Sequence, residues 1–495
     1  MNIRSSIRSL VRVALLLSSM TVPAFVNAQA PAPQSTPPPP APPRSVQLPK
    51  PVEKTLANGL RVIVVERPGT PLVAAQLLIK NGAEVDSPEL AGLANMTAGL
   101  LTMGTEKRSA TEIAEAVEAL GASLDSSARW DASRVNLNVM SSKVAPALEI
   151  MADVVRRPTF QEDEVERLRQ QTIDDLTVEL GDPGSIAAYV ASRVIFGDTP
   201  YGQPLSGTPQ SIARITRADF VKYHSSFYRP DNAVLIFGGD IKAGEAFKFA
   251  QQLFGDWKNP ATPMPPIAAP KLTTGEPRVI VIDKPDAGQA AVIVARTGIE
   301  RNDPDYFRGI VTNSVLTGYS GRLNQEIRIK RGLSYGARSA LDARRFTGPF
   351  HASAQTKNAS AAEVASLLME EVKRLGTAPV PDIELEPRKA VVIGNFSRSL
   401  ETAAGLVNQV GLLALYGVKF DEINRYIPSV QAITAADIQR FAGSRLAAQG
   451  TNIIVVGNAK EFLPKLTEMY PNVKVIPVAE LDLNTGLLTK KQPSE

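Results

Sequence analysis

Apolar residues along the chain fall into short runs that predict β-strands. Leu60–Val65 and Val279–Ile282 are rich in β-branched residues, and each is followed shortly by a proline. A second apolar run comes after each of them, at Val73–Ile79 and Ala290–Ala295. Apolar residues at 135, 137 and 139 alternate with polar ones, which predicts a strand with one buried face.

Helical patterns lie between these strands. Ser109–Glu112 has the Ser-x-x-Glu spacing of a capping box and opens a helix that Gly121 ends. A longer, charged helix is predicted from about Gln161 to Leu180, followed by Gly181–Gly184. Strands and helices mix without strict alternation, so the fold class is α+β, with helices on one face of a largely antiparallel sheet.

The chain repeats itself with a period near 218 residues. Three pairs of segments align at an offset of 217 or 218: Arg61–Pro68 with Arg278–Pro285, Ser211–Asp219 with Ser429–Asp437, and Asn232–Gly239 with Gly450–Gly457. Chance similarity between strands would not keep one register over so long a stretch. We therefore predict two homologous domains, at 51–258 and 271–485, joined by a proline-rich linker at 259–270 and followed by a tail at 486–495.

The N-terminus has the order of an export signal. Three arginines precede a short apolar run, Val13–Leu17, and the segment closes on Val26–Ala28, which predicts a signal peptide at 1–28. A proline-rich, extended leader is expected at 29–50. No later run reaches the ~18 apolar residues of a membrane span. A soluble periplasmic protein without a membrane partner is the resulting expectation.

Composition narrows the chemistry further. The 495 residues include no cysteine, which removes disulfides, thiolate nucleophiles and thiolate metal ligands. A net charge of only +4 with dispersed arginines argues against a nucleic-acid partner. The only histidines are His224 and His351, in different predicted domains, so they are expected to be structural and cannot share one zinc ion.

Several motifs give the chain a resemblance to a known family. They are Leu56–Val62, Gly92–Ala94, Gly104–Thr105, Pro200–Gly202 and Phe227–Asn232. Together they resemble the pitrilysin and insulinase family of zinc peptidases, in particular its half-size members such as the subunits of mitochondrial processing peptidase. The resemblance extends from about residue 50 to 460. It implies two similar α+β domains and pairs of chains that close around a peptide.

The zinc motif of that family is degenerate in this chain. Where the family has His-x-x-Glu-His, Asn95 and Gly99 replace the histidines and Ala98 replaces the general base. Asp175, with Asp174 beside it, stands where the family supplies a ligand glutamate. We therefore expect no catalytic residue, metal ligand or cofactor in this chain. Zinc is expected in a homologous zinc-bearing peptidase subunit, in a heterodimer or larger complex.

A second family feature is present. Arg328 and Tyr335 match a pair that, in the enzymes it resembles, donates hydrogen bonds to a backbone carbonyl of the bound peptide. A helix from about Ser320 is predicted to end at Arg331–Gly332 and a strand to begin at Leu333, so both side chains would converge at the corner. The alternative is ordinary structure, because cations favour a last helical turn and tyrosine favours strands.

The predicted function combines these features. The chain would be the zinc-less subunit of a heteromeric peptidase that contributes Arg328 and Tyr335 as substrate-binding donors to the partner's active site. The alternative is a structural or peptide-binding scaffold without a peptidase partner. Gly332–Gly336 matches the Gly-x-Ser-x-Gly elbow of serine hydrolases, but that motif requires a strand before the serine and a helix after it, the reverse of the order predicted here.

Overall fold

The computed structural model describes residues 49–267, 269, 276–447 and 449–490, which belong to one compact unit. The predicted signal peptide, nearly all of the leader and part of the linker lie outside the described residues. Among the helices that the structure describes, none is long and apolar enough to cross a bilayer.

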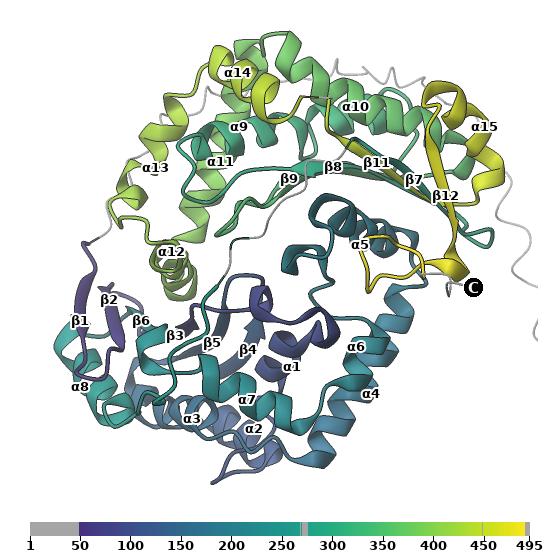
Figure 1. Cartoon of the computed structure of the whole chain (residues 1–495). Helices are drawn as coiled ribbons and strands as arrows, with labels where there is room; N and C mark the ends of the chain where they lie inside the picture. The colour runs from purple at the N-terminus through teal and green to yellow at the C-terminus, as the bar shows by residue number, and fades with distance from the viewer. Residues whose placement is uncertain (1–48, 268, 270–275, 448, 491–495) are drawn as a thin grey trace, which may run out of the picture. The chain divides into compact units, whose positions relative to one another are not determined.

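Two six-stranded sheets form the centre of the fold, and they have the same strand order (Figure 1). The first sheet runs β1-β2-β6-β3-β5-β4 and the second runs β12-β7-β11-β8-β10-β9. The strands of the first are β1 Val52–Thr55, β2 Arg61–Glu66, β3 Leu72–Ile79, β4 Ser123–Ala128, β5 Ser133–Met140 and β6 Ala233–Gly239. Those of the second are β7 Val279–Asp283, β8 Ala290–Thr297, β9 Ala337–Leu341, β10 Pro349–Thr356, β11 Asn452–Gly457 and β12 Val473–Pro477.

The pairing of these strands confirms the predicted duplication. β2 pairs with β6 in parallel, and the equivalent β7 and β11 also pair in parallel, whereas the next three pairs of each sheet are antiparallel. The sheets differ only at one edge, where β1 is antiparallel to β2 and β12 is parallel to β7. Thr216 and Thr434, at equivalent positions of the repeat, both begin a helix with a capping box.

Helices of each half cover one face of that half's sheet. The first half contains α1 Leu93–Leu100, α2 Ala110–Ala119, α3 Val144–Arg156, α4 Glu162–Glu179, α5 Pro183–Phe196, α6 Pro209–Arg214, α7 Arg217–Phe227 and α8 Ala243–Phe254. The second contains α9 Tyr306–Leu316, α10 Ala361–Thr377, α11 Asp382–Ser399, α12 Ala403–Tyr416, α13 Glu422–Gln431, α14 Ala435–Arg445 and α15 Ala459–Met469. The α+β class is confirmed, and the predicted capping box opens α2 at Ser109.

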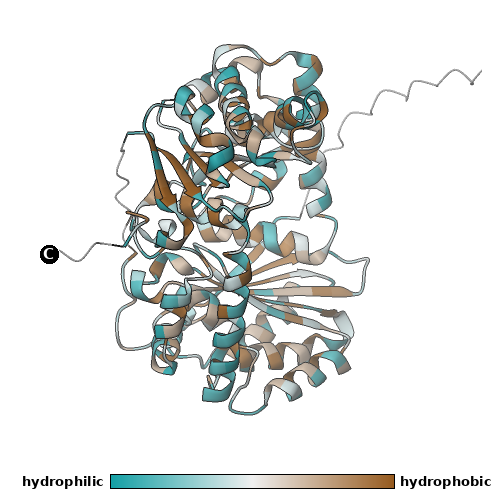
Figure 2. Cartoon of the chain, turned by 90° about the vertical axis from the view of Figure 1, so that its right-hand side faces the viewer, coloured by the Kyte–Doolittle hydropathy of each residue, from teal (hydrophilic) through white to brown (hydrophobic). Residues whose placement is uncertain are grey.

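The other face of each sheet is covered by a helix from the opposite half, which the sequence did not predict. α12 packs on β3 and β6 of the first sheet, and α5 packs on β8 and β11 of the second (Figure 1). Val410 of α12 is buried in one apolar cluster with Ile63 and Ile236. Gly411 allows this close approach, because a methyl group built on it would come within 2.3 Å of Gln76 Oε1. Figure 2 shows the strands coloured mainly hydrophobic, as expected for sheets covered on both faces.

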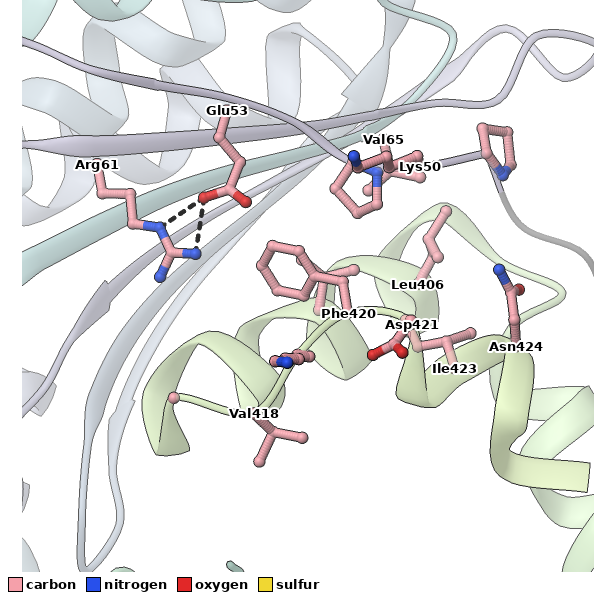
Figure 3. Close-up of a pocket in the computed structure, with 15 residues that line it drawn as sticks. Lys50, Glu53, Arg61, Val65, Leu406, Val418, Phe420, Asp421, Ile423 and Asn424 are labelled. Atoms are coloured by element: carbon pink, nitrogen blue, oxygen red, sulfur yellow. Dashed lines mark hydrogen bonds and ion pairs between the residues drawn. The ribbon is translucent and has the colours of Figure 1, made fainter. Parts of the chain in front are cut away.

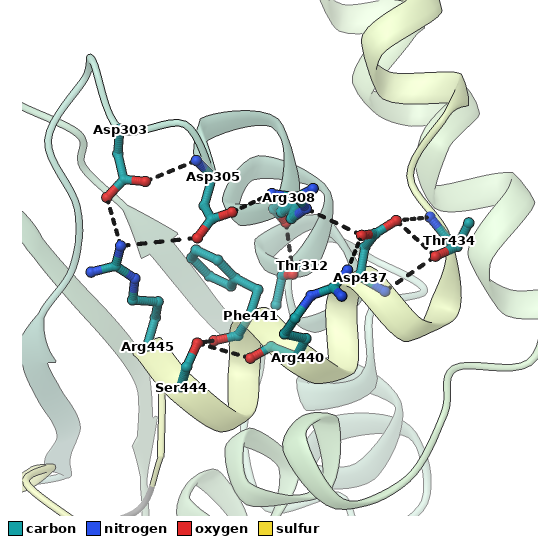
Figure 4. A network of polar contacts seen from close by, with 10 residues as sticks. All are labelled: Asp303, Asp305, Arg308, Thr312, Thr434, Asp437, Arg440, Phe441, Ser444 and Arg445. Carbon is teal, nitrogen blue, oxygen red and sulfur yellow. Dashed lines mark hydrogen bonds and ion pairs between the residues drawn. The ribbon is translucent and has the colours of Figure 1, made fainter.

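Polar networks hold the helices of the second half to one another (Figure 4). Arg308 of α9 lies 3.2 Å from Asp437 at the start of α14, and Arg445 at the end of α14 lies 3.1 Å from Asp303. The Thr434 hydroxyl, which donates to Asp437, lowers the pKa of that carboxyl to about 2. These charged residues stabilise the packing of helices.

The chain returns to the first half after β12. Arg193 Nε of α5 donates to the Leu483 carbonyl at 2.8 Å, Thr208 Oγ1 to Asn484 Oδ1 at 2.6 Å, and the Gly486 amide to Asp198 Oδ1 at 2.6 Å. Leu488 is buried in the cluster around α5. The described part of the predicted tail is therefore packed against the first half, whereas the predicted domain boundaries stay predictions.

Candidate substrate-binding site

A cavity of about 770 Å³ lies on the α5 side of the second sheet. Its floor is formed by β8, β10 and the edge strand β9, and one wall is the N-terminal turn of α5 from the first half. The opposite wall comes from the segment after α9 and the turn before β9. Both predicted donors, Arg328 and Tyr335, line this cavity.

The backbone around Arg328 differs in part from the prediction. Residues Asn324–Ile329 form a π-helix, a rare geometry that is often found at functional sites. The helical segment ends at Ile329, with Lys330 as its C-cap, slightly before the predicted end at Arg331–Gly332. Gly332 follows with a positive φ of 63°, which suits glycine. The prediction that a strand begins at Leu333 is wrong, because β9 begins at Ala337.

A turn replaces the first residues of the predicted strand. The Ser334 hydroxyl accepts from the Gly336 amide at 3.1 Å and donates to the Gly336 carbonyl at 2.8 Å. A serine whose hydroxyl bonds the backbone two residues further on favours a turn over a strand ladder. The turn pushes Tyr335 outward, and its side chain is 90% exposed.

The two donors have no hydrogen-bond partner within the described parts of the chain. Arg328 is half-buried, and its guanidinium lies over the ring of Tyr319, 5.3 Å from the centroid. The phenol of Tyr335 and the guanidinium of Arg328 therefore remain available to a carbonyl oxygen that enters the cavity. The geometry places both side chains on one cavity.

The cavity also contains residues that the sequence did not single out as binding groups. Arg338 projects from β9, and His351 and Ser353 line the cavity from β10. Burial, and then the positive charge of Arg338, lower the pKa of His351. Asp182 caps α5 by accepting from the Ser185 amide at 2.8 Å. The register of β9 on β10 brings Arg338, His351 and Ser353 together, and α5 brings Asp182 from the first half, so sequence spacing could not have found them.

The degenerate zinc motif lies on α1, away from this cavity. Ala98 is completely buried, and a side chain built on Gly99 would approach Leu168 of α4 at 3.4 Å. Asn95 is half-buried, and Asp175 is exposed on α4. Glycine and alanine offer no ligand, so these residues do not fit a zinc ion. Among the residues that the structure describes, no group of three or more ionisable side chains is arranged to hold a metal ion.

The arrangement around Ser334 does not fit a serine hydrolase. A helical segment precedes the serine and a strand follows it, whereas a nucleophile elbow needs the reverse order. His351 lines the same cavity, but the Ser334 hydroxyl bonds Gly336. The sequence-based rejection of a serine hydrolase agrees with this geometry.

His224 is a structural residue, as predicted. Its ring is partly buried, its Nε2 lies 2.8 Å from the Val155 carbonyl, and it stacks on Tyr228 with 4.8 Å between ring centroids. Burial lowers its pKa from 6.5 to about 4. The neutral ring is therefore the form that the folded state accommodates.

This low pKa predicts a loss of stability in acid. Between pH 6.5 and about 4 the unfolded chain binds a proton at His224 that the folded chain does not, so the free energy of unfolding falls as the pH falls. We expect His224 to lower the free energy of unfolding by ~2 kcal/mol at pH 5 relative to pH 7, a difference that urea unfolding at the two pH values would measure. His224→Gln should reduce this pH dependence by that amount. An unchanged dependence in the variant would contradict the assignment.

Another cavity, of about 610 Å³, lies between β1–β2 and the loop that joins α12 to α13 (Figure 3). Arg61 pairs with Glu53 at 2.7 Å and lies over the ring of Phe420, 5.5 Å from the centroid. In this cavity Arg61 is therefore paired with Glu53, whereas Arg328 and Tyr335 in the other cavity have no hydrogen-bond partner among the described residues.

Comparisons with known proteins match both halves. Residues 61–208 match the profile described as insulinase, peptidase family M16, and residues 214–391 match the one described as the peptidase M16 inactive domain. An uncharacterized zinc protease of Streptomyces coelicolor is 24% identical over 82% of this chain and 89% of its own length. A probable mitochondrial-processing peptidase β subunit of Arabidopsis thaliana is 26% identical over 54% of this chain and 50% of that protein.

A solved structure supports the same grouping. The crystal structure described as a peptidase M16 inactive domain from Pseudomonas fluorescens superposes with a TM-score of 0.76 and 26% sequence identity, over 82% of this chain and 98% of that one. The resemblance stated from the sequence motifs and the two-domain fold are thereby confirmed.

Proposed function

Because this chain belongs to the insulinase family of peptidases, family M16, we propose that it is the zinc-less subunit of a two-chain peptidase. A homologous partner would supply the zinc ion and the general base. This chain would supply Arg328 and Tyr335, which bind the substrate next to the partner's zinc. The observation that carries the proposal is that these two donors share one cavity and have no partner among the described residues, while α1 holds no zinc ligand.

The chemistry of the two side chains suits this role. A peptide carbonyl gains negative charge as its carbon becomes tetrahedral, and donors already in position stabilise that charge. Arg328 is partly fixed by Tyr319 and by the π-helix, and its planar guanidinium offers several N–H donors. Tyr335 adds a neutral donor from the turn before β9.

Metal analysis and reconstitution test the division of labour. We expect the purified chain to contain no stoichiometric zinc and to hydrolyse no peptide, since Asn95, Ala98 and Gly99 provide neither ligand nor base. Coexpressed with a homologue that has an intact His-x-x-Glu-His motif, it should copurify as a complex with about one zinc per pair and peptidase activity.

Two results would contradict the proposal. One zinc per isolated chain would show that this chain makes a metal site of its own. Failure to copurify with any zinc-bearing homologue, with peptide binding retained, would favour the scaffold alternative.

A further inference from the structure

The register of the two sheets allows residues at equivalent positions to be compared directly. Across the second sheet, one row of neighbours consists of Ile454, Ile293, Ser353 and Arg338. Across the first sheet, the equivalent row consists of Ile236, Gln76, Asn136 and Asp125. Arg338 on the edge strand β9 therefore takes the place of Asp125 on the edge strand β4, and the two side chains have opposite charge.

Hydrogen bonds link the polar residues of the row in the first half, although Gln76 Oε1 has no partner among the described residues. Gln76 Nε2 donates to Asn136 Oδ1 at 2.9 Å, and Asn136 Nδ2 donates to Asp125 Oδ2 at 2.8 Å. Arg134, which lines the adjacent cavity of about 400 Å³, donates to Asn408 of α12 at 2.9 Å. The polar residues there hold strands and helix together.

The row in the second half leaves its charge without a partner. Arg338 makes no hydrogen bond or ion pair with any residue that the structure describes, and its neighbours in the row, Ser353 and Ile293, offer no carboxylate. Arg328, on the opposite wall, likewise has no acidic partner there. The one acidic residue that lines the cavity, Asp182, is bound to the N-terminus of α5.

We propose that Arg338, together with Arg328, makes this cavity a subsite for a carboxylate of the bound peptide, either an acidic side chain or a free C-terminus. The inference rests on the proposed function in taking the ligand to be a peptide. Its physical basis is a surplus of positive charge, since two guanidinium groups face one cavity of about 770 Å³ while the carboxylate of Asp182 is already bound to the first turn of α5.

Guanidinium groups favour a carboxylate in particular. Their N–H groups form a planar fork that matches two carboxylate oxygens, and a cavity with a surplus of one sign of charge attracts the opposite sign. Because Arg338 is exposed and Arg328 is half-buried, we expect solvent to screen the interaction in part. We therefore expect the cavity to prefer peptides that carry a carboxylate but not to require one.

Peptide binding to the purified full-length chain tests the proposal. The probes are three fluorescent peptides with a repeating serine-alanine sequence: an amidated one with a central glutamate, an amidated one with glutamine, and the glutamine peptide with a free C-terminus. Fluorescence anisotropy at low salt should give a Kd about fivefold lower for the glutamate peptide, for the free-acid peptide, or for both, than for the amidated glutamine peptide. The two arms distinguish a side-chain carboxylate from a terminal one.

Variants at equivalent positions make the test specific. Arg338→Gln should abolish the preference, and Arg338→Glu should reverse it in favour of a peptide with a central lysine. Asp125→Ala, at the matching position of the first sheet, should keep the wild-type preference. Equal binding of all three peptides, no measurable binding of any, or an unchanged preference in Arg338→Gln would overturn the proposal. None of these results would by itself disprove the zinc-less subunit function, which depends on copurification and on Arg328.

Discussion

Replacing Arg328 with alanine is expected to lower kcat/KM of the assembled two-chain peptidase by on the order of 10²–10³, the typical effect of losing one oxyanion-type donor. Tyr335→Phe, which removes only the hydroxyl, should have an effect in the same direction. Both side chains line one cavity and have no partner within the described residues, so no internal hydrogen bond is lost with them. Steady-state kinetics on a peptide substrate would measure the change.

Control measurements separate binding chemistry from folding. Lys330→Ala removes a nearby positive charge that is paired with Glu326 at 2.7 Å on the surface, and it should leave kcat/KM within about twofold of the wild type. Size-exclusion chromatography should show that each variant assembles with its partner. Normal turnover in both Arg328→Ala and Tyr335→Phe would remove the donor pair from the mechanism.

The second large effect is expected at Asp131, where the two halves meet. Its carboxylate is 3% exposed, and it accepts hydrogen bonds from the Tyr201 hydroxyl, from the Arg345 amide at 2.7 Å and from the Tyr416 hydroxyl at 2.9 Å. Burial raises the pKa of both tyrosines, so their hydroxyls remain donors. Asp131→Ala should lower the free energy of unfolding by about 3–5 kcal/mol, because it leaves buried donors without an acceptor.

Urea unfolding followed by circular dichroism would measure this loss. Asp174→Ala is a suitable control, because Asp174 is exposed on α4 and, within the described part of the chain, accepts only from Gln170. Its effect should stay within about 0.5 kcal/mol. If the Asp131 variant unfolds at the same urea concentration as the wild type, the buried network does not hold the halves together.

Local patterns in the sequence were sufficient for many individual elements. The alternation at 135, 137 and 139 gave a strand, and the charged segment near 161–180 gave a helix, because side-chain periodicity depends only on backbone geometry. The start of β9 could not be predicted, because the Ser334 turn competes with the strand through a hydrogen bond between side chain and backbone. Apolar patterns also do not say which sheet a helix will cover. The sequence therefore did not predict that α5 packs on the second sheet and α12 on the first.

The sequence by itself determined the duplication, the family and the loss of the zinc motif, since a repeated register and a histidine count do not depend on folding. Tertiary structure alone decided which residues share the cavity. Arg338 and His351 meet there through strand pairing, and Asp182 arrives on a helix from the other half. The physical reason is that strand register and helix exchange depend on contacts between residues far apart in the chain, which no local pattern encodes.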